Sequence, residues 1–206
     1  MDSYLEPAEV VTLEEKIKRS VFIGHLFPCR DVADVREIAA RVESEHKNAT
    51  HNCRAYVLGP EADVGYSSDD GEPAGTAGKP ILSAIRRSGM TNVMVVVTRY
   101  FGGIKLGVRG LIDAYGGVAS GVVGLARPVA KIRSRRLVIC LPYAIISDIT
   151  HVLNAEGMVG VPDWAYGERV ELTAEVRFSA VFRVAGILDE FKARNRIYSW
   201  SWVSLN

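Results

Sequence analysis

The chain has 206 residues, of which 48% are hydrophobic and 24% are charged, and its formal net charge is +1. These proportions are typical of a globular protein and exclude a disordered or fibrous chain. No apolar stretch is long enough to cross a bilayer, and the first ten residues lack the basic start and apolar run of a secretion signal. Three cysteines at wide spacing form no disulfide framework or zinc knuckle. We therefore expect a cytoplasmic protein without a membrane partner, while its oligomeric state stays open.

Positive charge is concentrated in the middle of the sequence. Residues 79–136 hold eleven Lys and Arg against one Asp, a net charge of +10. Residues 1–78 carry −7 and residues 137–206 carry −2. Clustered cations gain free energy by releasing counterions condensed on nucleic acid, so the basic segment favours a phosphate-rich partner. The alternative is that the acidic segment folds back onto it.

The first half of the chain predicts strands and helices in mixed order. Aromatic and branched side chains over 20–29 predict a strand, and Asp31 is placed as the N-cap of an amphipathic helix that follows. Residues 65–80 hold four glycines and two prolines and predict an irregular loop of functional length. The other elements expected here are strands over 52–59 and 92–101, a helix over 80–88 ended by Gly89, and a helix over 111–126.

The composition changes at Arg127-Pro128, and a second pattern follows. Alternation with a period of two over 170–178 is the clearest strand signal in the chain. The other elements expected in this half are strands over 137–141, 159–166 and 197–205 and helices over 145–156 and 182–191. Their order, βαββαβ, is that of a ferredoxin-like domain. We therefore predict two α+β domains, residues 1–130 and 135–206.

The glycine-rich segment after residue 101 is the first candidate binding site. It follows a strand, opens a helix, and contains Gly102, Gly103 and Gly107 together with Lys105 and Arg109. Backbone N–H groups at a helix N-terminus, flanked by cations, bind phosphate or carboxylate groups. The alternative is a tight turn whose glycines serve backbone geometry alone.

Three more residues complete the predicted nucleic-acid or anion-binding surface: Lys79, Arg99 and Tyr100. Arginine beside exposed aromatic rings grips single-stranded nucleic acid through phosphate pairing and base stacking. The alternative is an aromatic pair divided between core and surface, with Arg99 solvated.

Asp69, Asp70 and Glu72 form a carboxylate cluster on the 65–80 loop. Carboxylate oxygens are ligands for Mg²⁺ and Ca²⁺, so a metal-dependent reaction on a phosphorylated substrate held by Lys79 is one interpretation. The twelve-position ligand ladder of a calcium loop is missing, which favours a solvated acidic loop instead.

Catalytic chemistry has little support in the sequence. His51 and Cys53 share one face of a strand, where a nucleophile–base pair is possible, but a buried structural cysteine is favoured. His25, His46 and His151 have no partner at metal-ligand spacing. No nucleophile, base and orienting group form a set, so we assign no catalytic residue, no metal site and no cofactor.

Three stretches of the sequence closely resemble the YigZ/IMPACT family: residues 51–56, 66–80 and 99–107. The acidic Asp-Asp-Gly-Glu-Pro-Ala-Gly loop and the later Arg-Tyr-Phe-Gly-Gly are long and unusual. The match covers roughly residues 20–126, and the rest looks like the C-terminal extension of the bacterial YigZ branch. The residues that match the family's motif are Asp69, Asp70, Gly71, Glu72, Pro73, Gly75, Gly78, Lys79, Arg99, Tyr100, Gly102, Gly103, Lys105, Leu106 and Gly107.

The resemblance implies both a fold and a class of partner. The first domain is expected to be similar to the second domain of a small-subunit ribosomal protein, a βα sandwich. The second is expected to be similar to the last domain of elongation factor G, which is ferredoxin-like. Both relatives contact RNA, and the eukaryotic branch of the family restrains a translation kinase. The expectation is a binding protein for RNA or a ribosome-associated factor that regulates translation, with a metal-dependent enzyme at the 65–80 loop as the alternative.

Two departures from the family pattern lie beside the glycine turn. Val108-Arg109 stand where relatives usually show Thr-Gly, and Asp113 replaces a common basic residue. A backbone with positive φ at Arg109 would be strained, and Asp113 lowers the positive potential of the predicted surface.

Overall fold

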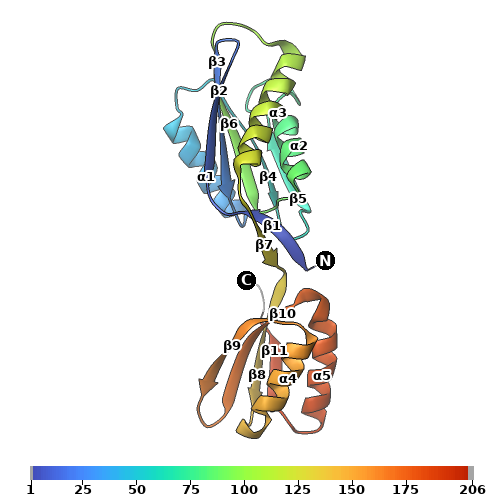
Figure 1. Cartoon of the computed structure of the whole chain (residues 1–206). Helices are drawn as coiled ribbons and strands as arrows, with labels where there is room; N and C mark the ends of the chain where they lie inside the picture. The colour runs from blue at the N-terminus through green and yellow to red at the C-terminus, as the bar shows by residue number, and fades with distance from the viewer. Residues whose placement is uncertain (1, 204–206) are drawn as a thin grey trace. The chain divides into compact units, whose positions relative to one another are not determined.

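A computed structural model of the chain, which describes residues 2–203, divides it into two compact α+β units (Figure 1). The first unit is Tyr4–Lys131, and the second contains Ile132 onward together with Asp2 and Ser3. This confirms the predicted fold class of two mixed domains. No helix in the described range is both long enough and apolar enough to cross a membrane.

The first unit is built on a five-stranded antiparallel sheet. Its strands, in spatial order, are β2 (Val11–Ile17), β3 (Ser20–Pro28), β6 (Val93–Tyr100), β4 (His51–Leu58) and β5 (Val64–Ser68). Helices α2 (Gly78–Ser88) and α3 (Gly107–Leu125) pack on one face, and α1 (Val32–Glu45) packs on the other (Figure 1). The central strand β6 is therefore buried on both faces, which explains its continuous apolar run.

Local signals at the helix ends act as the sequence predicts. The Asp31 carboxylate accepts the backbone N–H groups of Ala33 and Asp34 at 2.7 and 2.9 Å, so it caps α1. Gly89 ends α2 in the left-handed conformation, with φ of 71°.

Four strands, β1 (Ser3–Pro7), β2, β5 and β7 (Pro128–Ile132), lie outside the predicted elements. The prediction of an irregular loop over 65–80 is wrong at both ends, because β5 extends to Ser68 and α2 begins at Gly78. A short edge strand needs no apolar run, since its side chains face solvent. The polar lead also contains β1, which pairs with β7, and the alternating strand β2.

The second unit is a four-stranded sheet in the order β11-β8-β10-β9, with two helices packed on it. In chain order its elements are β8 (Ser134–Leu141), a short 3-10 turn (Tyr143–Ile145), α4 (Ile146–Glu156), β9 (Met158–Tyr166), β10 (Val170–Arg177), a 3-10 turn (Phe178–Ala180), α5 (Val181–Ala193) and β11 (Ser199–Trp202). This is the predicted βαββαβ order. The end of the last predicted strand, residues 204–205, lies outside the described residues.

Candidate functional site: a pocket beside a buried arginine

The loop between β5 and α2 folds around one carboxylate. The side chain of Asp69 accepts the backbone N–H groups of Gly75, Ala77 and Gly78 at 2.8, 2.9 and 2.8 Å. Burial alone would raise the pKa of the Asp69 carboxyl, but these three donors hold the pKa below its ordinary value. Asp69 therefore organises the loop as an anion enclosed by backbone.

The next two residues turn the chain back onto β4. Asp70 and Gly71 have positive φ angles of 43° and 86°. The Asp70 carboxylate accepts the Asn52 N–H at 2.6 Å, and its carbonyl oxygen accepts Nδ1–H of His51 at 2.7 Å. The turn is thus fixed to the strand, and it directs Glu72 into the interior.

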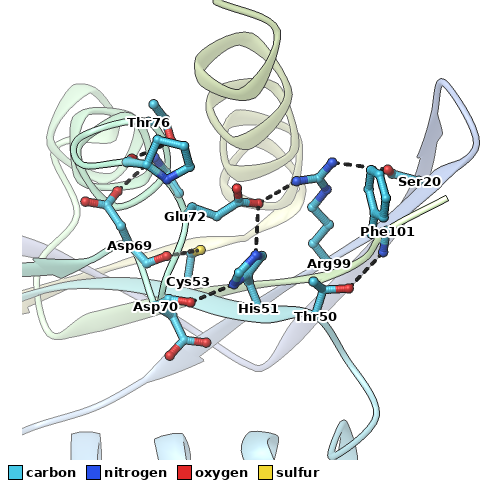
Figure 2. Close-up of polar contacts among 12 residues, drawn as sticks. Ser20, Thr50, His51, Cys53, Asp69, Asp70, Glu72, Thr76, Arg99 and Phe101 are labelled. Carbon is cyan, nitrogen blue, oxygen red and sulfur yellow. Dashed lines mark hydrogen bonds and ion pairs between the residues drawn. The ribbon is translucent and has the colours of Figure 1, made fainter. Parts of the chain in front are cut away.

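Glu72 forms a buried ion pair with Arg99, shown in Figure 2. The distance from Nη1 to Oε1 is 2.6 Å, and the two side chains are 6% and 4% exposed. The Tyr115 hydroxyl donates to the same oxygen at 2.8 Å, and His51 Nε2 lies 3.9 Å from it. The Arg99 guanidinium is therefore the counter-charge of this buried carboxylate.

The Arg99 guanidinium lies close to two aromatic rings. Its central carbon lies 5.4 Å from the ring centroid of Phe22 and 5.3 Å from that of Phe101. Nη2 donates to Ser20 Oγ at 3.4 Å, whereas Nε is buried and has no hydrogen-bond partner in residues 2–203. One donor of a buried cation is therefore left unused.

Cys53 and Tyr115 stay neutral beside this ion pair. The Cys53 thiol is fully buried and donates to the Asp69 carbonyl oxygen at 2.9 Å. Burial raises its pKa to about 12, and burial likewise raises the pKa of the Tyr115 hydroxyl. Cys53 is thus a structural residue, as the sequence favoured, and no nucleophile–base pair with His51 forms.

The glycine turn after β6 is shaped by close backbone approach. A Cβ atom on Gly102 would lie 1.9 Å from the Arg19 carbonyl oxygen, so no side chain fits there. Gly103 and Gly107 have positive φ angles of 83° and 73°. These glycines therefore serve backbone geometry. Arg109 lies inside α3 without a positive φ, so the strain considered for it does not arise.

The loop, the ion pair and the glycine turn enclose an open pocket of about 470 Å³. Apolar walls come from Phe101, Leu106, Val108 and Leu111. The remaining lining residues are Thr50, His51, Glu72, Pro73, Arg99, Lys105 and Gly107. The pocket thus combines an apolar body with a few polar groups, the usual composition of a ligand site.

The structure divides the residues singled out in the sequence among separate places. Glu72, Arg99, Lys105 and Gly107 meet at the pocket, with Gly102 and Gly103 in the turn beside it. Arg109 is 86% exposed and pairs with Asp113 at 3.2 Å. Tyr100 follows Arg99 on the opposite face of the sheet, where its hydroxyl contacts His46.

Lys79 lies in a different hollow, of about 570 Å³, along α2. Arg86 and Arg87 line the same hollow. Neither Lys79 nor Arg86 has an ion-pair partner within the described part of the chain. Their spacing of seven and eight residues on one helix is a signal from which the sequence could have predicted this basic strip. Tyr115 carries no such signal, since only the fold brings it to Glu72.

The loop carboxylates are occupied by protein donors. Asp69 and Asp70 bind backbone N–H groups, and Glu72 binds Arg99 and Tyr115. Across residues 2–203 no group of three or more His, Cys, Asp or Glu side chains is arranged to hold a metal ion.

Comparison with known proteins places this architecture in a family. The model of the Impact N-terminal domain matches residues 18–123. The Escherichia coli "IMPACT family member YigZ" is 38% identical over 166 residues, 79% of this chain and 78% of that protein. A Haemophilus influenzae "IMPACT family member" is 49% identical over 119 residues, 56% of this chain and only 57% of that protein.

A solved structure extends the similarity over both units. The crystal structure of a hypothetical protein matches with a TM-score of 0.69 and 32% identity, covering 100% of this chain and 98% of that one. The family match contains the 69–78 loop, the Glu72–Arg99 pair and the glycine turn. On these matches, the chain belongs to the IMPACT family.

Proposed function

We propose that this chain is a nucleic-acid-binding protein that holds single-stranded RNA at the pocket beside Arg99. The observation that carries the proposal is the lining of the pocket, which combines an aromatic ring with two cationic side chains. Phe101 is 45% exposed, Lys105 is exposed, and Arg99 lies behind them. The family resemblance adds RNA or a ribosome-associated factor as the partner and translation as the process regulated.

The chemistry of the wall suits an unpaired nucleotide. Single-stranded RNA is recognised by stacking its bases on aromatic and guanidinium planes, each stacked base contributing about 1–3 kcal/mol. Phe101 supplies such a plane at the surface, and the buried Arg99 guanidinium lies 5.3 Å from its ring centroid. Lys105 lacks an ion-pair partner within residues 2–203, so its charge is available to a phosphate.

The size of the pocket is compatible with this ligand. Its volume of about 470 Å³ falls in the range of small-molecule sites, large enough for one nucleotide. The basic strip of Lys79, Arg86 and Arg87 on α2 would bind further phosphates without regard to sequence.

No observation favours the metal-dependent enzyme as a second function. Each carboxylate of the loop already accepts hydrogen bonds from the protein, and Glu72 is in an ion pair with Arg99. Recruiting them to a metal ion would release the loop from α2 and β4.

Titration of labelled single-stranded RNA at several salt concentrations tests the proposal. The logarithm of the affinity should fall linearly with the logarithm of the salt concentration, and Lys105→Ala should reduce the slope by about 0.7. Phe101→Ala should weaken binding about tenfold with an unchanged slope, because it removes stacking and no charge.

Two further variants locate the site. Lys47→Ala removes an exposed charge just after α1, outside the pocket, and should change neither slope nor affinity. The double variant Lys79→Ala/Arg86→Ala reports on the strip alone. The absence of saturable binding at low salt would refute RNA binding, and an effect of the double variant alone would move the site to α2.

A further inference from the structure

A chain of four hydrogen-bonded side chains lies on the α1 face of the first sheet. Thr12 Oγ1 lies 3.1 Å from His25 Nδ1, the two Nε2 atoms of His25 and His46 are 3.2 Å apart, and His46 Nδ1 lies 2.9 Å from the Tyr100 hydroxyl. Phe22 and Leu26 of β3 face α2 and α3. Because successive side chains of a strand point to opposite faces, His25 faces the other side of the sheet. This cluster is therefore separate from the pocket.

We propose that His25 and His46 are the protein ligands of a divalent transition-metal ion, with zinc, nickel and copper as the candidates. Two nitrogens bound to one tetrahedral zinc ion at the usual bond length are about 3.3 Å apart. The Nε2 atoms, at 3.2 Å, already have this separation. The separation of the two atoms thus suits one ion that lies off the line between them.

The outer nitrogens of the two rings support the same assignment. A histidine that binds a metal through Nε2 carries its proton on Nδ1, and in metal sites that N–H almost always donates to an oxygen. Here both Nδ1 atoms have such an oxygen, Thr12 Oγ1 for His25 and the Tyr100 hydroxyl for His46. Without metal, one proton lies between the two Nε2 atoms. Binding moves that proton to Nδ1, so two neutral rings release none.

The backbone around the two rings favours a cation. His46 is the C-cap of α1, and its N–H donates to the Val42 carbonyl at 2.9 Å. The C-terminal end of a helix carries partial negative charge and stabilises a nearby cation. His25 is held on β3 and stacks on Phe27 with ring centroids 6.0 Å apart.

The donor set also indicates which ions bind and how. Imidazole nitrogen prefers zinc, nickel and copper, whereas Mg²⁺ and Ca²⁺ require oxygen ligands. Both rings are half-buried, and no third His, Cys, Asp or Glu joins them in the part of the chain that the structure describes. Water therefore completes the coordination, which makes the ion exchangeable.

Calorimetric titration of the full chain, without an affinity tag, tests the site with Ni²⁺ and Zn²⁺. We expect one ion per chain, and a loss of at least about tenfold in affinity for both His25→Gln and His46→Gln. Tyr100→Phe should also weaken binding about tenfold, since it removes the oxygen that holds His46 Nδ1–H. His151→Gln, in the second unit, is the matched control and should bind like the unchanged chain.

Thiols are the competing ligands, and Cys140 is the cysteine that is not fully buried. Cys140→Ser should leave Ni²⁺ and Zn²⁺ binding unchanged. Should a histidine variant fail to fold, the ¹⁵N resonances of the histidine rings in the unchanged chain give the same answer, because Zn²⁺ must shift Nε2 of His25 and His46 together. No saturable binding, or binding that survives both histidine substitutions, would overturn the proposal.

Discussion

The two units differ in what they bury. The first unit buries seven polar or charged side chains: Ser20, Asn52, Glu72, Thr76, Thr91, Thr98 and Arg99. The described part of the second unit buries apolar side chains alone, and its ion pairs lie at the surface, each side chain at least 30% exposed. A buried ion pair adds little stability over an apolar core, because desolvation offsets the attraction. The buried charges of the first unit, Glu72 and Arg99, therefore belong to its candidate site and contribute little to its stability. The second unit is stabilised by apolar packing.

Of the substitutions that test this difference, removal of the buried carboxylate should have the largest effect. Glu72→Gln leaves the Arg99 guanidinium buried without a counter-charge, and we expect the first unit to lose about 3–5 kcal/mol of unfolding free energy. All three tryptophans, Trp164, Trp200 and Trp202, lie in the second unit. In denaturant unfolding, the transition of the first unit, followed by circular dichroism, should therefore move to lower denaturant concentration. The transition followed by tryptophan fluorescence, which reports the second unit, should not move.

The matched control is a surface pair of the second unit. Glu156→Gln removes the partner of Arg183, whose nitrogen lies 3.0 Å away, and should cost less than about 1 kcal/mol. If the two substitutions destabilised their units equally, burial would not be what distinguishes the pairs.

The glycine turn offers the next largest effect. Gly102→Ala places a Cβ atom against the Arg19 backbone, and we expect a loss of about 2–3 kcal/mol. Gly117→Ala, on the exposed side of α3 with no atom near the added Cβ, should instead stabilise by about 0.5–1 kcal/mol. Thermal unfolding of the two variants measures both. A tolerated Gly102→Ala would mean that the turn moves easily.

The smallest effect concerns Asp69 and depends on pH. Asp69→Ala removes the acceptor of three backbone N–H groups and should cost about 1 kcal/mol at pH 7. The folded pKa of Asp69 lies below its ordinary value of 3.8, so its contribution is complete above the unfolded pKa and fades as pH falls through the folded one. Denaturant unfolding from pH 7 down to pH 3 should show the two chains converging. A constant difference would show that the charge of Asp69 is not what stabilises the loop.

How far the sequence predicts this fold depends on the kind of strand. The second unit was predicted nearly element by element, because strands such as β10 alternate over their whole length. Strands β1, β2, β5 and β7 are not predicted, since they are short or lie at sheet edges, where polar residues predominate.

The site was less predictable than the fold. Arg99 was expected to be solvated or bound to a ligand, yet its partner Glu72 comes from a turn 27 residues away that only the folded sheet brings near. His25 and His46 showed no metal-ligand spacing, because they lie on β3 and at the end of α1, 21 residues apart. Local patterns do not encode such pairs, whereas Asp31 and Gly89 act on their own neighbours.

The pairing of β1 with β7 has a consequence for the synthesis of the first unit and for the choice of an expression boundary. One edge of β1 has no partner until Pro128–Ile132, much later in the chain, has also been synthesised. An unpaired strand edge invites association with other chains, so the nascent protein carries this liability while the residues between β1 and β7 are synthesised. A fragment that stops at the end of α3 would keep it permanently, and an expression boundary for the first unit belongs beyond Ile132.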